Sequence, residues 1–174
     1  MLSVNIVFYL QLIQHVQIFS FIEQAYVIGY VIIGRFNKGP DINAVVHTHP
    51  PLTIGVIAGG GRIGPMFPDF VAYLGSLGYI DYVTPCTAEL ARAVQSQVKD
   101  KNGVLMLGHG ALTVGQNLKE AFQRTELIEE SARILIAAKQ FGEPRILTSK
   151  ECDEIRNLDA EKYRMELIKK ANSR

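Results

Sequence analysis

Three histidines have the type and spacing of residues that could hold a metal ion. His47 and His49 lie in the stretch His-Thr-His-Pro, directly after the apolar run Ala44-Val45-Val46. On a β-strand, residues i and i+2 point to the same side, so the two imidazoles would lie side by side. Taken alone, the pair is weak evidence for a metal site, because a strand can also tolerate two histidines.

His109 adds a third imidazole in the stretch Gly108-His109-Gly110, which follows another apolar run. Glycines on both sides allow positive φ and let the backbone approach a bound ion or substrate closely. Three neutral imidazoles with an open position are typical of a catalytic zinc site, whereas structural sites are usually closed and rich in thiolates. The fourth histidine, His15, lies in a stretch interrupted by polar residues, and we interpret it as structural or exposed.

The elements that would position these histidines alternate between strands and helices. Apolar runs predict strands, while capping residues and periodic apolar positions predict helices. The expected strands are 44–47, 79–83, 104–107 and 111–114, and the expected helices are 52–58, 69–77, 87–98, 117–140 and one last helix from 148. This order is typical of a layered α/β domain. The hairpin-like pair around His109 indicates a sheet that is not purely parallel.

Composition restricts the possible functions further. The chain has 174 residues, enough for one ordinary domain, and its formal net charge of +1 gives no basic face for nucleic acid. Two cysteines far apart, Cys86 and Cys152, are typical of a reduced intracellular protein, so we expect a cytoplasmic location. The glycines at 59–61 lack the Gly-Lys-Ser/Thr of a nucleotide-binding loop, and we interpret them as a helix end.

The first 34 residues are poor in charge, with one carboxylate, Glu23, and no lysine or arginine. A membrane anchor is one alternative. However, polar residues interrupt the stretch, and it lacks the basic start and the cleavage site of a signal peptide. We therefore interpret it as a buried strand or helix segment and expect no membrane association.

The motifs AVVHTHP and LMLGHGALTVG, with His109 60 residues after His49, resemble the class II aldolase/adducin family. The resemblance runs from about Gly39 to Gln140 and includes a long Ala/Glu-rich helix. It implies one domain over residues 1–174 with an atypical start over 1–38. The implied fold is a three-layer α/β/α arrangement with a mainly antiparallel central sheet. A homotetramer with the site near a subunit boundary is implied as well.

The same resemblance implies a divalent metal, usually zinc, on His47, His49 and His109. The implied function is a metal-dependent aldolase or lyase that cleaves a C–C bond of a small sugar phosphate or keto acid through a metal-stabilised enediolate. That intermediate would equally serve a family epimerase, dehydratase or decarboxylase, so the exact reaction stays open. A non-catalytic, adducin-like or degenerate domain is the second hypothesis.

Three further residues are candidates for proton transfer. Asp69 lies near a catalytic acid of the family's epimerases, or it is a carboxylate favoured by a helix N-terminus. Tyr163 lies where some members keep a C-terminal tyrosine, or it is a surface residue on a charged helix. Glu23 would take the place of the family's metal-binding or basic acid after an insertion of about five residues, since an acid in an apolar stretch needs a partner.

The family's N-terminal glycine-rich phosphate-binding segment has no counterpart here. The contacts to a sugar phosphate are therefore expected to differ from those of the family. A substrate held by its carboxylate or carbonyl would account for the difference, and so would a truncated or shifted start of the chain.

Overall fold

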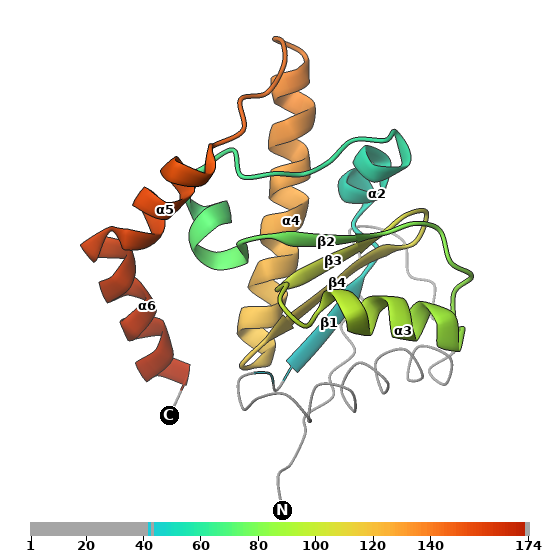
Figure 1. Ribbon diagram of the computed structural model, residues 1–174, viewed down its shortest axis with the longest axis horizontal. Coiled ribbons are helices and arrows are strands. Elements are labelled where there is room, and N and C mark those ends of the chain that lie inside the picture. The colour runs from blue at the N-terminus through green and yellow to red at the C-terminus, as the bar shows by residue number, and fades with distance from the viewer. Residues whose placement is uncertain (1–41, 43, 173–174) are drawn as a thin grey trace, which may run out of the picture.

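A four-stranded sheet lies at the centre of the computed structural model, which describes Ile42 and residues 44–172. The strands are β1 (Ala44–Thr48), β2 (Leu77–Ile80), β3 (Gly103–Met106) and β4 (Gly110–Gly115), and their spatial order is β1-β4-β3-β2 (Figure 1). In the register of the sheet, the last residue of β1 and the turn between β3 and β4 lie at the same end. The topology therefore brings His49 and His109 close together.

The sheet is mixed, so the prediction of a mainly antiparallel sheet is wrong, although the predicted α/β class is confirmed. β4 is antiparallel to both β1 and β3, whereas β2 is parallel to β3. Parallel neighbours need a long crossover connection, and helix α3 (Ala88–Gln97) supplies it between β2 and β3. A tight turn is enough to join the antiparallel strands β3 and β4.

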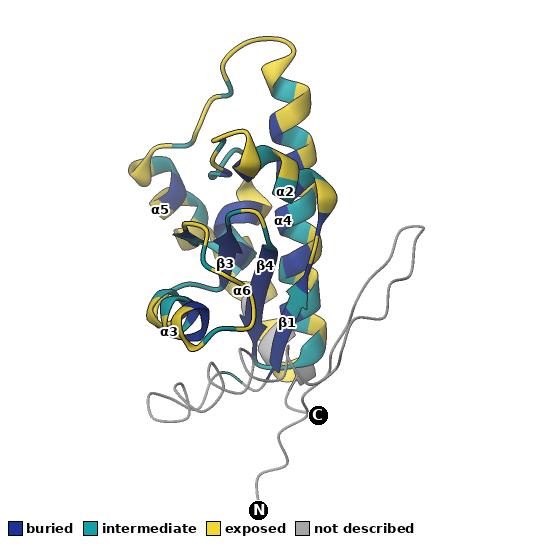
Figure 2. Cartoon of the chain, turned by 90° about the vertical axis from the view of Figure 1, so that its right-hand side faces the viewer, coloured by how far each residue is buried: buried dark blue, intermediate teal, exposed yellow. Residues whose placement is uncertain are grey.

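Helices cover both faces of the sheet, which gives three layers. One face packs against α3, and the other packs against α2 (Pro51–Ala58), η1 (Phe70–Leu74) and α4 (Leu118–Lys139). The central strands β3 and β4 are buried along their whole length (Figure 2). Alternate residues of β3 serve the two faces: Val104 and Met106 belong to the apolar cluster with α3, and Leu105 to the cluster with α4. The core is therefore two apolar layers separated by the sheet.

Polar side chains begin the helices at the capping positions that the sequence predicts. The Asn117 side chain accepts a hydrogen bond from the backbone N–H of Glu120 at the start of α4. Thr148 and Glu151 form a reciprocal capping box at the start of α5 (Ser149–Asn157). Such caps satisfy N–H groups that have no partner within the helix.

Two predicted helices differ from the structure. The single helix expected from residue 148 is divided into α5 and α6 (Asp159–Asn172), because Leu158 between them has an extended backbone with ψ of 131°. The helix expected over 69–77 is only the π-helical turn η1, which ends at Gly75 with φ of 74°. Strand β2 then begins at Leu77, two residues earlier than predicted.

Helices long and apolar enough to cross a membrane are absent from the described part of the chain. Residues 1–34, on which the membrane alternative rested, lie outside the described residues, and so does the candidate Glu23.

Candidate metal centre

His47 lies on β1 opposite Leu112 of β4, and a hydrogen bond to the backbone of β4 fixes its ring. Its Nδ1 is 2.9 Å from the carbonyl oxygen of Ala111. Because a carbonyl oxygen only accepts, Nδ1 carries the proton and donates it, and Nε2 keeps a free lone pair. A backbone carbonyl that selects the tautomer in this way is a usual outer partner of a metal-binding histidine. Nε2 is therefore the atom of His47 that could bind a metal ion.

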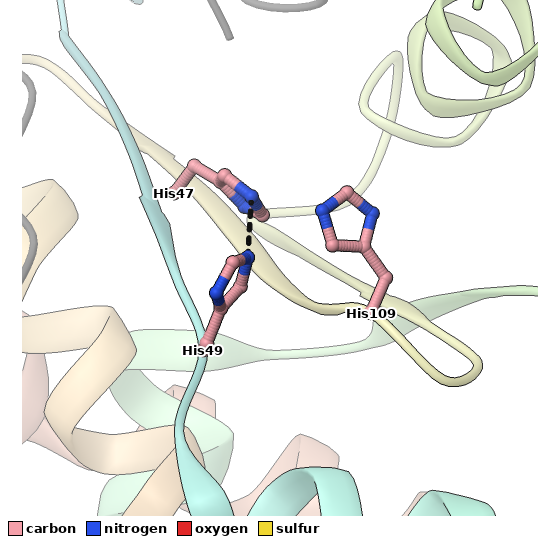
Figure 3. A group of neighbouring side chains, drawn as sticks. All are labelled: His47, His49 and His109. Carbon is pink, nitrogen blue, oxygen red and sulfur yellow. Dashed lines mark hydrogen bonds between the residues drawn. The ribbon is translucent and has the colours of Figure 1, made fainter. Parts of the chain in front are cut away.

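His49 and His109 complete a triangle of imidazoles with His47 (Figure 3). His49 directly follows β1, and His109 lies in the turn between β3 and β4. The ring centroids of His47 are 4.9 Å from those of both His49 and His109, and the last two are 5.2 Å apart. Gly108 has φ of 66°, a conformation that glycine adopts without strain, so this turn depends on the glycine before His109.

The nitrogen atoms of His47 and His49 have the spacing of two ligands on a tetrahedral metal ion. The Nε2 atoms of His47 and His49 are 3.2 Å apart, and one ring nitrogen from each of the three residues lies within 4.8 Å of the others. Two nitrogens bound to a tetrahedral zinc ion are separated by about 3.3 Å. Among the described residues, Nδ1 of His109 is buried and has no hydrogen-bond partner. A buried polar atom without a partner lowers the stability of the fold, unless a group such as a metal ion binds to it. The three residues thus fit a divalent ion such as zinc.

All three imidazoles are held in the neutral form that binds metal ions. The pKa of His47 is lowered to about 3, first by burial and then by the nearby imidazoles of His109 and His49, against the opposing effect of the hydrogen bond to Ala111. Burial lowers the pKa of His49 as well. For His109, burial and then the charge of His49 lower the pKa. At neutral pH a metal therefore does not have to compete with imidazolium protons for these ring nitrogens.

These pKa shifts predict a zinc affinity that resists mild acid. Protons compete with the metal for the same lone pairs, so lowered pKa values move the loss of affinity to lower pH. Three histidines with the ordinary pKa of about 6.5 would lose zinc affinity about 50-fold between pH 7.5 and pH 6. We expect a clearly smaller loss here, measured by competition with a chromophoric chelator at each pH. A loss as large as that of three ordinary histidines would contradict the burial of the site.

Asp69 and Tyr163 lie away from the histidines within the chain. Asp69 directly precedes η1, and Tyr163 lies on α6. Both η1 and α6 lie beside α5 at one side of the sheet, whereas the turn between β3 and β4 lies at the other side (Figure 1). The Asp69 carboxylate is 3.6 Å from the Arg164 guanidinium, and Tyr163 is 63% exposed. The structure therefore groups the three histidines but not these two candidates.

Glu129 of α4 is a residue near the site that the sequence analysis missed. Its carboxylate accepts hydrogen bonds from the first turn of α2, the helix that follows His49. One signal in the sequence could have indicated such an acceptor. Pro50 and Pro51 begin this helix without a Ser, Thr, Asp or Asn cap, so its free N–H groups need a partner from elsewhere.

Comparison with known proteins assigns the chain to a family. The family model of the Class II Aldolase and Adducin N-terminal domain matches residues 34–136, which is more than half of the chain. The chain belongs to this family. The matched range contains His47, His49 and His109, and the family resemblance of the two histidine motifs is thereby confirmed.

Similar proteins of this family are described as sugar-phosphate aldolases. The chain is 35% identical over 124 residues to a 5-deoxy-D-ribulose 1-phosphate aldolase of Bacillus thuringiensis serovar kurstaki, which covers 71% of this chain and 56% of the relative. It is 30% identical over 108 residues to an L-fuculose phosphate aldolase of Methanococcus maripaludis, with 62% and 59% covered. The chain thus spans less than two thirds of the length of these relatives.

Solved structures of aldolases share the fold. An L-fuculose 1-phosphate aldolase matches with a TM-score of 0.67 at 27% identity, over 78% of this chain and 62% of that one. The L-fuculose-1-phosphate aldolase from Thermus thermophilus matches with a TM-score of 0.59 at 26% identity, over 66% and 62%. The arrangement of sheet and helices is therefore that of class II aldolases.

Proposed function

We propose that this class II aldolase centre is zinc-dependent and cleaves a C–C bond of a small ketose phosphate. The observation that carries the proposal is the pair of Nε2 atoms of His47 and His49, 3.2 Å apart, with the first of them oriented by Ala111. Without a metal, Nε2 of His49 donates a hydrogen bond to Nε2 of His47, whereas a bound cation would take a lone pair from each of these two nitrogens. Relatives described as sugar-phosphate aldolases support the choice of substrate class.

The three histidines would hold the ion, and zinc suits three neutral imidazoles with an open position. When bound, the ion supplies Lewis-acid stabilisation of the negative charge that develops as the C–C bond breaks. The chain itself keeps the imidazoles neutral by burial and fixes the His47 tautomer through Ala111. It also places His109 on a short turn, so that the three rings face a common point (Figure 3).

Cleavage of a 2-ketose 1-phosphate between C3 and C4 gives dihydroxyacetone phosphate and an aldehyde. A base must remove the proton of the C4 hydroxyl, the electron pair of the C3–C4 bond moves toward the carbonyl fragment, and an acid returns a proton to C3. Glu23, Asp69 and Tyr163 are the proposed proton carriers. Our proposal for the assembly is a homotetramer in the cytoplasm.

Asp69 and Tyr163 would act on the site of a neighbouring copy. Within one chain they lie beside α5, and Asp69 is paired with Arg164 there. A site near a subunit boundary would let these side chains reach the histidines of the next subunit. Asp69→Asn is then expected to lower cleavage while the zinc content stays at the parent level. An unchanged cleavage rate would remove Asp69 from the proposal.

The proposed function is tested on the full chain by elemental analysis and by cleavage assays. We expect about one zinc ion per chain, as one three-histidine site holds one ion, and dihydroxyacetone phosphate formed from 5-deoxyribulose 1-phosphate or L-fuculose 1-phosphate. A folded chain that takes up no zinc would overturn the proposal and favour the adducin-like alternative.

A decarboxylase is the second candidate function. The chain is 25% identical over 130 residues to a 3-oxo-tetronate 4-phosphate decarboxylase of Haemophilus influenzae, with 72% of this chain covered. Loss of CO2 from a 3-oxo acid leaves the electron pair of the broken bond on the carbon beside the carbonyl, which is the same kind of negative charge, so the same three histidines would serve. Zinc binding without aldol cleavage, together with CO2 release from a phosphorylated keto acid, would favour this candidate.

A further inference from the structure

Glu129 of α4 caps a helix that is not its own. Its Oε1 accepts a hydrogen bond from the backbone N–H of Leu52 at 3.0 Å. Its Oε2 accepts one from the backbone N–H of Thr53 at 2.9 Å and one from the Thr53 hydroxyl at 2.8 Å. Leu52 and Thr53 lie in the first turn of α2, whose own N-cap, Pro50, makes no side-chain cap. A carboxylate from a distant helix therefore replaces the missing cap.

The capped turn is joined to His49 by a stiff connection. Only Pro50 and Pro51 separate His49 from Leu52, and proline fixes φ and restricts the residue before it. Pro50 has φ of –73° and ψ of 121°. Since this linker has little freedom, the position of the first turn of α2 determines the position of the His49 backbone.

His49 needs this support more than the other ligands do. β1 ends at Thr48, so His49 lies beyond the strand pairing that holds His47. His47 also has the hydrogen bond to Ala111, and His109 lies within a short turn between two paired strands. His49 is the most exposed of the three histidines. Its placement therefore depends on the two prolines and on the helix α2 that they begin.

We propose that Glu129 is a positioning residue of the metal centre: by holding the first turn of α2, it sets the place of His49. The proposal rests on the proposed metal-binding function. It does not make Glu129 essential for the fold, because α2 and α4 also share apolar contacts in the cluster that contains Ile57, Ile128 and Ala132. Without the Glu129 carboxylate, α2 and α4 would stay packed against each other, but the first turn of α2 would be held less firmly.

The test compares Glu129→Gln with Glu130→Gln in the full chain. Glutamine keeps the size of Glu129 but turns one acceptor oxygen into a donor, which cannot pair with an N–H. Glu130 is an exposed neighbour on the same helix, 3.4 Å from Arg133. We expect zinc affinity to fall about 10- to 100-fold in Glu129→Gln, as is usual for outer partners of a metal site, and to stay at the parent value in Glu130→Gln.

Two further readouts separate positioning from stability. The visible absorption of the Co²⁺-loaded chain should change in Glu129→Gln, since a displaced ligand alters the coordination geometry. A Glu129→Gln chain that is less stable to heat but keeps parent zinc affinity and the parent Co²⁺ spectrum would overturn the inference. If that variant does not fold, Thr53→Val removes one of the three hydrogen bonds, and a smaller loss of zinc affinity is expected. Unchanged affinity in that case would equally overturn it.

The parent chain separates this failure from a failure of the proposed function. If the parent and Glu130→Gln bind no zinc, the metal centre itself is wrong, and the role of Glu129 is wrong with it. If both bind zinc tightly and Glu129→Gln does too, only the role of Glu129 is wrong.

Discussion

Replacing His109 by alanine is expected to abolish zinc binding without harming the metal-free fold. The change removes one of three ligands, so zinc affinity should fall by more than the factor of about 100 that loss of an outer partner costs. Cleavage activity should fall at least about 1,000-fold, the upper range for loss of one charge-stabilising group. Zinc content by elemental analysis and a cleavage assay with excess zinc measure the two effects.

The stability of His109→Ala relative to the parent should differ between the metal-free and the zinc-loaded state. Among the described residues, Nδ1 of His109 is buried without a partner, so its removal should leave the metal-free chain as stable as the parent, or more stable by about 1 kcal/mol. Zinc at about 1,000 times its dissociation constant should stabilise the parent by about 4 kcal/mol and the variant hardly at all. His15→Ala, at the one other histidine of the sequence, is the control. A variant that zinc still stabilises as it does the parent would exclude His109 as a ligand.

The histidine centre could be predicted because local rules determine its parts. The i, i+2 spacing of His47 and His49 on a strand needs only the strand geometry, and the glycines around His109 indicate a tight turn. That these two stretches come together is a matter of tertiary structure, which the spacing of residues does not predict. The family resemblance predicted it instead. The start of α4 at Asn117 was equally local, because the cap and its partner are three residues apart.

Contacts between distant segments could not be predicted from the sequence. Glu129 resembles the other acids of a long helix, and its partner Thr53 is 76 residues away. The parallel pairing of β2 with β3 follows from the packing of α3 across the sheet, which apolar periodicity does not reveal. The break at Leu158 was missed because apolar positions continue on both sides of it. In each case, several local structures or contacts are compatible with the sequence, and tertiary packing determines which one forms.

Gly110→Ala is expected to damage the fold and the metal centre together. A Cβ at this position would lie 2.3 Å from the carbonyl oxygen of Thr48 and 2.8 Å from Cδ2 of the His49 ring. The first contact is with backbone, so β1 and the start of β4 must separate, at a cost of about 2–3 kcal/mol in the free energy of unfolding. The second displaces a ligand, so zinc affinity should fall more than about 10-fold, as for loss of an outer partner.

Gly55→Ala is the matched control for this prediction, because it adds the same methyl group on the exposed side of α2. No described atom lies within 4 Å of the Cβ that it would introduce. Alanine in a helix is favoured over glycine by about 0.5–1 kcal/mol, so this variant should be slightly more stable, with unchanged zinc affinity. Chemical denaturation and chelator competition measure both variants. If Gly110→Ala lost stability but bound zinc like the parent, contact of the turn with the His49 ring would not determine the ligand geometry, and the centre would tolerate a shifted β1.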